Sequence, residues 1–103
     1  LPTDKFVFLG FLPKKESAKK KLFTELKTNP LKATYVAYDS PERLLETLMV
    51  VREVCGLVAV SVHKEITKLH EERFSGTVDA VLKELNAKPK LKGEYVLVFR
   101  LEV

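Results

Sequence analysis

The sequence predicts an α/β domain, with a mixed sheet of about five strands and helices on its faces. Short segments rich in Val, Phe and Tyr alternate along the chain with longer segments whose apolar residues recur at helical spacing. The 103 residues, of which 46% are hydrophobic and 31% charged, suit one globular domain. Since no internal repeat or low-complexity stretch interrupts this alternation, we expect a single domain over residues 1–103.

The first half of the chain predicts two strand–helix units. Lys5–Gly10 is rich in Phe and Val and predicts a strand that stops at glycine. In Ser17–Lys27 apolar residues recur at every fourth position, which indicates an amphipathic helix. Thr34–Tyr38 predicts a second strand, and Ser40 directly after it can cap a helix whose first residue is Pro41.

The second half predicts three further strands. Leu57–Val62 is almost continuously apolar, which is typical of a central strand covered on both faces. His63–Arg73 is mostly charged, and its pattern leaves open an irregular loop or a short helix. Arg73–Thr77 can form a short strand, Thr77 can cap the helix that follows, and Tyr95–Leu101 predicts the last strand.

Composition restricts the class of partner and the compartment. The net charge of +4 suits an anionic partner without identifying one. The longest nearly apolar stretch, Cys55–Val62, is far shorter than the roughly 20 residues of a membrane span, so we expect no membrane partner. A single cysteine forms no internal disulfide, which suits the cytoplasm. No signal peptide follows Leu1, and we expect the chain to begin inside a longer protein.

Residues 38–43 (YDSPER) form the first candidate site, because they join the end of a strand to the start of a helix. In open α/β sheets ligands bind beyond the carboxyl ends of strands, and the free N–H groups of a helix start favour an anion. Asp39 could accept hydrogen bonds from hydroxyls or amines. The alternative is that Ser40 is only a cap and Pro41 only a helix starter.

Residues 64–72 (KEITKLHEE) form the second candidate site. The segment offers cations for phosphates and groups that can transfer a proton, although a solvated loop with local ion pairs has the same composition. We expect this segment and residues 38–43 to lie side by side on a common edge of the domain.

Two further groups of residues carry less specific chemistry. His63, His70 and Cys55 do not match a zinc spacing, so no metal site is predicted. The lysines around the first helix form either a phosphate-contacting patch or the polar face of that helix; they are Lys14, Lys15, Lys19, Lys20 and Lys21.

Four segments carry a family resemblance over nearly the whole chain: GFLPKK at 10–15, YDSPERLL at 38–45, KEITKLHEE at 64–72 with Gly76 and Thr77, and KGEYVLV at 92–98. In this order they resemble the C-terminal half of the ribosomal RNA small subunit methyltransferase I family, within the tetrapyrrole methylase superfamily. The resemblance implies an S-adenosylmethionine-dependent enzyme that methylates a cytidine ribose 2′-hydroxyl in 16S ribosomal RNA of the small ribosomal subunit. It also implies an N-terminal cofactor-binding domain outside this chain, without which the isolated domain is inactive.

The resemblance assigns expected roles to individual residues. The cofactor pocket would be lined by Tyr38, Asp39, Ser40, Pro41, Thr67, Gly93 and Glu94. RNA phosphates would be met by Arg43, Lys64 and Lys68, with Lys14 and Lys15 from the basic patch. Candidates for the base that accepts the hydroxyl proton are Glu65, Lys64 and Lys68. The chain departs from the family pattern Glu-Ser-Pro-His-Arg at Asp39 and Glu42.

Two other functions remain open on the residues alone. One is a tetrapyrrole methyltransferase domain, acting on a corrin or porphyrin. The other is a non-catalytic RNA-binding module. As a fragment of a two-domain enzyme, the isolated domain is expected to show an apolar or sparsely covered face where its companion belongs, and this face could also make a homodimer.

Overall fold

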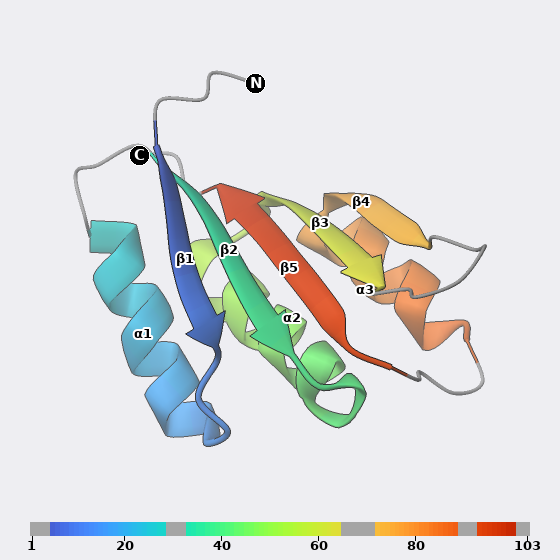
Figure 1. The fold of residues 1–103 in the computed structure, drawn as a ribbon, viewed down its shortest axis with the longest axis horizontal. Coiled ribbons are helices and arrows are strands. Elements are labelled where there is room, and N and C mark those ends of the chain that lie inside the picture. The colour runs from blue at the N-terminus through green and yellow to red at the C-terminus, as the bar shows by residue number, and fades with distance from the viewer. Residues whose placement is uncertain (1–4, 29–32, 65–71, 89–92, 101–103) are drawn as a thin grey trace.

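The computed structural model describes residues 5–28, 33–64, 72–88 and 93–100, which form a five-stranded mixed sheet and three helices (Figure 1). The predicted fold class is confirmed, and the element bounds lie close to the predicted ones. In chain order the elements are β1 (Phe6–Phe11), α1 (Glu16–Thr28), β2 (Thr34–Asp39), α2 (Pro41–Cys55), β3 (Ala59–Lys64), β4 (Arg73–Thr77), α3 (Val78–Asn86) and β5 (Tyr95–Arg100).

The strands lie in the order β1-β2-β5-β3-β4. β1 is parallel to β2, and the other three neighbouring pairs are antiparallel. The last strand of the sequence is therefore the middle strand of the sheet. The prediction that Leu57–Val62 forms a central strand is confirmed in part: β3 pairs with both β5 and β4, but the middle position belongs to β5, and Leu57 is exposed before the strand begins.

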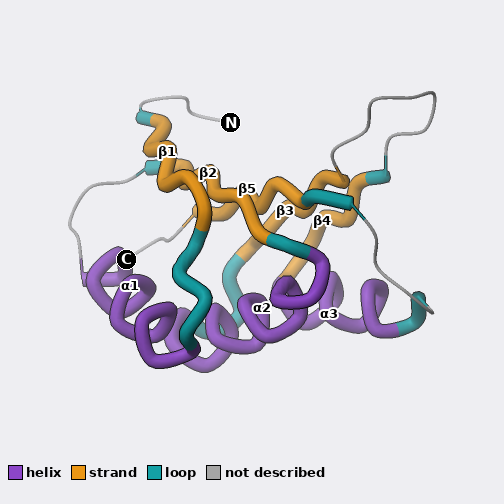
Figure 2. Tube along the Cα trace, turned by 60° about the horizontal axis from the view of Figure 1, so that its bottom comes forward, coloured by secondary structure: helices purple, strands orange, loops and turns teal. Residues whose placement is uncertain are grey.

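All three helices cover the same face of the sheet (Figure 2). Side chains on that face form the core, in which the rings of Tyr35 and Phe99 stack at 5.3 Å and Phe23 of α1 lies 5.4 Å from Phe99. Leu97 and Val62 belong to the same buried cluster. Burying side chains of this size contributes about 1.5–3 kcal/mol each, which is what holds the helices to the sheet.

The opposite face of the sheet, which we call the open face, carries no helix from the described part of the chain. The prediction that β3 is covered on both faces is therefore wrong. Its residues alternate, with Val60 and Val62 buried toward the helices and Ser61 and His63 on the open face. The apolar run Leu57–Val62 misled the prediction because its first residues precede the strand.

Local sequence signals fix the helix ends. α2 begins at Pro41 and ends at Cys55, and its C-cap is Gly56, whose φ of 79° lies in the region that glycine favours. The predicted cap of α3 is confirmed, since the Thr77 hydroxyl accepts a hydrogen bond from the Ala80 N–H. None of the described helices is long and apolar enough to cross a membrane.

Candidate functional site

The carboxyl ends of β2 and β3 and the amino end of β5 meet at one edge of the sheet, which we call the rim. The strand register aligns Asp39 with Tyr95 and Tyr95 with Lys64, so the three residues form one row across the strands. The turn at residues 38–43 and Lys64, the first residue of the second candidate segment, therefore lie at a common edge, as predicted. Residues 65–71, with the candidates Glu65, Thr67 and Lys68, lie outside the described residues.

Tyr38 lies on the open face beside the rim. It is half-buried, and its ring lies 5.4 Å from both Phe8 and Phe11 of the neighbouring strand β1. Phe8 meets it edge-on, at an interplanar angle of 81°, which is a favourable arrangement of two aromatic quadrupoles. Tyr38 thus joins the rim to a row of exposed aromatic rings.

Asp39 turns toward the helices and is 2% exposed. One carboxylate oxygen accepts a hydrogen bond from the Ser40 N–H at 2.9 Å, and the other accepts one from the Thr47 hydroxyl. Arg43 lies 3.9 Å from the same carboxylate, at ion-pair distance. A buried carboxylate needs such donors, and these groups fix the turn between β2 and α2.

Ser40 occupies the N-cap position of α2 but does not cap it with its side chain, so that part of the prediction is wrong. The carboxylate of Asp39 holds the Ser40 N–H, and the serine hydroxyl is buried with no hydrogen-bond partner among the described residues. A buried hydroxyl without a partner is costly unless something else supplies one. Ser40 is thus a polar group available at the start of a helix.

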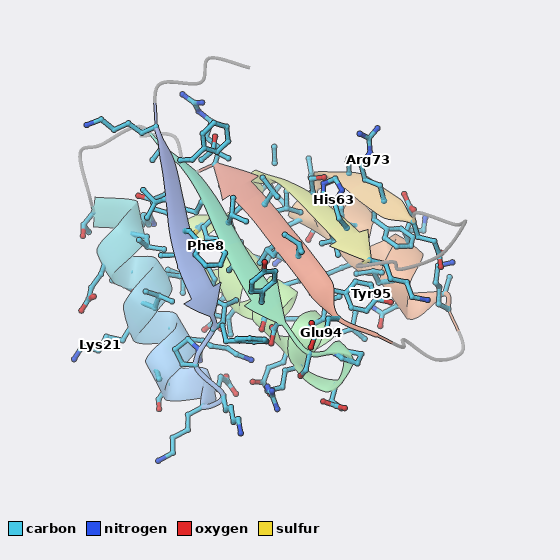
Figure 3. The ribbon with its side chains drawn as sticks, in the orientation of Figure 1. Phe8, Lys21, His63, Arg73, Glu94 and Tyr95 are labelled. Carbon is cyan, nitrogen blue, oxygen red and sulfur yellow. The ribbon has the colours of Figure 1, made fainter. Side chains whose placement is uncertain are left out.

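Gly93 lies against Lys64 at the rim. Its φ of 84° favours glycine, and a side chain there would meet the Lys64 side chain at 3.5 Å. Glu94, beside it, is exposed (Figure 3). The rim therefore brings together all of the predicted cofactor residues that the structure describes: Tyr38, Asp39, Ser40, Pro41, Gly93 and Glu94.

The Lys64 ammonium group belongs to a small ion-pair network. It lies 3.7 Å from a carboxylate oxygen of Glu72, whose other oxygen lies 3.0 Å from Lys88. The hydrogen bond and the charge of Lys88 lower the pKa of the Glu72 carboxyl, with a smaller contribution from Lys64. The network holds Glu72 against the end of β3.

The lysines of the first helix do not form one patch. Lys19 is fully buried and lies 3.2 Å from Glu46 of α2, so it is not available to a phosphate. Lys20 lies near Glu16 and Glu53, and these two carboxylates raise its pKa. Lys14 and Lys15 are exposed just before α1.

Sequence reasoning missed a polar network on the open face. The Ser61 hydroxyl lies 2.8 Å from a ring nitrogen of His63 and 3.1 Å from the hydroxyl of Ser75 on β4. Arg73 is aligned with His63 across the same pair of strands. The signal in the sequence is that Ser61 and His63 alternate with two valines. Such alternation is typical of a strand with one buried face and one open face.

The described residues hold no group of three or more His, Cys, Asp or Glu side chains that could bind a metal ion. His70 lies outside them. Cys55 is a half-buried free thiol at the end of α2, and burial raises its pKa, which makes it a poor nucleophile.

Comparison with known proteins points to one group. No family model matches the chain. It is 43% identical over 98 residues to "Ribosomal RNA small subunit methyltransferase I" of Rickettsia prowazekii, covering 95% of this chain and 34% of that protein. Proteins of the same name from Hydrogenobaculum and Thermotoga maritima are 38% identical over 104 and 97 residues, covering 99% and 94% of this chain and 43% and 42% of the relatives.

The resemblance inferred from four short segments is thus confirmed along nearly the whole chain. The chain spans between a third and a half of the length of these relatives.

Proposed function

We propose that the chain is the C-terminal domain of a cytoplasmic, S-adenosylmethionine-dependent methyltransferase that acts on a cytidine ribose 2′-hydroxyl of 16S ribosomal RNA. The names of the relatives support the methyltransferase and its ribosomal RNA substrate. Their greater length supports a further domain, which we place before this one in the chain. The resemblance of the four segments is what favours the cofactor and the ribose hydroxyl.

The observation that carries the proposal is the shared rim. Asp39, Tyr95 and Lys64 lie in one row of the sheet, so the turn at 38–41, Lys64 and Gly93 come from distant parts of the chain to one edge. Ligands of open α/β sheets bind beyond strand ends of this kind. A second domain that closed over this edge would complete a cleft.

The described residues at the rim fit a cofactor with polar groups. The buried hydroxyl of Ser40 needs a partner, and the helix start beside it favours a carboxylate such as the one that S-adenosylmethionine carries. Gly93 has no side chain to keep a ligand from its backbone. We therefore assign the cofactor to Tyr38, Ser40, Pro41, Gly93 and Glu94, with Thr67 from the segment outside the described residues.

Asp39 does not bind the cofactor directly in this proposal. Its two oxygens are already used by the Ser40 N–H and the Thr47 hydroxyl. We propose that it positions Ser40 and Pro41 and does not contact the cofactor with its side chain.

Methyl transfer requires the donor carbon and the ribose oxygen to be aligned, and such positioning can lower a barrier by roughly 7–11 kcal/mol at best. S-adenosylmethionine supplies the methyl group when it is bound. Arg43 and Lys64 bring positive charge to the rim, where they suit RNA phosphates. Glu65, Lys64 and Lys68 remain proposed candidates for the proton acceptor.

The experiment uses the longer protein to which we assign this chain. It should bind S-adenosylmethionine in calorimetry and transfer a radiolabelled methyl group to 30S particles, whereas the 103-residue chain alone should transfer none. Transfer to porphyrin precursors in place of 30S particles would show a tetrapyrrole methyltransferase. Failure to bind S-adenosylmethionine at all would leave the non-catalytic RNA-binding module.

A further inference from the structure

Half of the open face is aromatic. Phe6, Phe8 and Phe11 follow one another along β1 and are 61%, 63% and 66% exposed. Tyr38 lies against Phe8 and Phe11 from the next strand. Large apolar side chains gathered on one exposed surface usually mark a binding site.

The other half of the open face is polar and basic. Ser61, His63 and Ser75 share hydrogen bonds across β3 and β4. Arg73 is aligned with His63 at the same end of these strands, and both side chains can be seen beside each other on the side facing the viewer in Figure 3. Hydroxyls, an imidazole and a guanidinium are all groups that bind a phosphate or a ribose.

The described strand residues on the open face include positive charge and no negative charge. Among the described strand residues that face this side, none is an aspartate or glutamate, and Arg73 is positively charged and exposed. The carboxylate of Asp39, on the same sheet, is buried on the helix side. The whole chain carries a net charge of +4. An anionic partner is therefore favoured.

We propose that the open face binds a short segment of single-stranded RNA, with bases stacked on Phe8, Phe11 and Tyr38 and phosphates at Arg73 and His63. The inference rests on the proposed function in taking RNA as the substrate, and it names a surface that adjoins the rim at Tyr38. Five strands span about 19 Å at the usual strand spacing, which accommodates a few nucleotides. Unpaired bases stack on aromatic side chains of exposed sheets, whereas paired bases cannot.

Two features favour RNA over another protein surface. A purely apolar partner would leave the network of Ser61, His63 and Ser75 buried against nothing polar, which costs free energy. A second copy of this chain would bring basic side chains to a face that has no described strand carboxylate to pair with them. RNA offers both bases for the aromatic half and phosphates and hydroxyls for the polar half.

The test measures fluorescence anisotropy of a labelled oligouridylate of about eight nucleotides, a length within the site size of single-strand binders, titrated with the 103-residue chain. Phe8→Ala should weaken binding about 5-fold to 100-fold. Met49→Ala is the matched control, because Met49 is 61% exposed on α2, in the helix layer. It should leave the affinity unchanged.

A second pair of variants tests the phosphate half. Arg73→Gln should lower the slope of log affinity against log salt by about 0.7, the contribution of one phosphate contact on a single strand. Lys21→Gln removes the same charge from an exposed position on α1 and should leave the slope unchanged. Equal slopes for the two variants would remove Arg73 from the RNA surface and overturn the proposal.

Phe8→Leu separates stacking from apolar docking, and circular dichroism checks the fold of each variant. Leucine keeps an apolar side chain but cannot stack a base, so an RNA surface predicts weaker binding. Unchanged RNA affinity in Phe8→Leu and Phe8→Ala, together with Phe8-dependent self-association in sedimentation velocity, would make the face a contact between copies. These outcomes are independent of methyl transfer, since a chain that binds oligouridylate through Phe8 could belong to a protein that transfers no methyl group.

Discussion

The hydroxyl of Thr47 in α2 donates a hydrogen bond to the buried carboxylate of Asp39 at the end of β2. The same carboxylate accepts the Ser40 N–H, so one side chain ties a strand, a turn and a helix together. The position of Ser40 at the rim therefore depends on a pair of residues that face away from it.

Replacing Thr47 with valine tests this pair. Thr47→Val keeps the shape but removes the donor, so we expect the free energy of unfolding in urea to fall by about 1–3 kcal/mol. Thr24→Val is the control, because Thr24 is exposed on α1 and bonds only to a carbonyl of its own helix among the described contacts. It should change stability by less than about 0.5 kcal/mol. If the two variants lower the free energy of unfolding equally, the hydrogen bond from Thr47 to Asp39 does not stabilise the fold.

Ser40→Trp tests the cofactor assignment in the longer protein. A tryptophan at the start of α2 would fill the space beside the rim, so we expect the affinity for S-adenosylmethionine in calorimetry to fall at least tenfold while the circular dichroism spectrum is retained. Ser17→Trp is the control, since Ser17 is exposed in the first turn of α1. If both variants bind the cofactor as the unmodified protein does, Ser40 does not border the pocket.

The ion pairs of Glu72 predict a pH dependence of stability. Lys88 and Lys64 lower the pKa of Glu72 in the folded chain below its ordinary value. The stabilisation is therefore present above the ordinary glutamate pKa and is lost as the pH falls through the lower, folded value. Glu72→Gln should remove this acid-side loss in urea unfolding measured between about pH 3 and pH 7. Glu84→Gln, at an exposed position of α3, should leave the pH profile unchanged.

The buried ammonium of Lys19 predicts an asymmetry between two variants. Lys19→Met replaces a desolvated charge with an apolar side chain of similar length, so stability should be unchanged or higher. Glu46→Ala leaves the buried ammonium without its carboxylate and should lower the free energy of unfolding, by about 1–3 kcal/mol. Urea unfolding measures both. A larger loss for Lys19→Met than for Glu46→Ala would mean that Lys19 stabilises the α1–α2 contact by its charge.

Much of the fold could be predicted from local signals. Strand composition, helical spacing, the helix-starting Pro41 and the capping Thr77 each act within a few residues, so the sequence carries them directly. The order of strands does not follow from such signals. β5 is recognised as a strand from its residues, but its central place depends on pairing with both β2 and β3, which are far away in the chain.

The candidate site was predicted in outline, because strand ends and helix starts are visible in the sequence. Its details depend on contacts between distant residues. The Ser40 hydroxyl does not cap α2, and the Asp39 carboxylate beside it is held by the Thr47 hydroxyl, 8 residues away. Lys19 is buried because Glu46, 27 residues away, lies beside it. Neither contact has a local pattern that could predict it.

The central place of β5 also determines when the sheet can form. Within the sheet, β1 with β2 and β3 with β4 are two separate ribbons, and only β5 hydrogen-bonds to both. During synthesis β5 leaves the ribosome after the other four strands. Each of the two ribbons therefore has an unpaired edge until residues 95–100 emerge. Because the bridging contacts join distant residues, we expect assembly to be a late and cooperative step, and loss of these six residues to abolish the fold rather than shorten it.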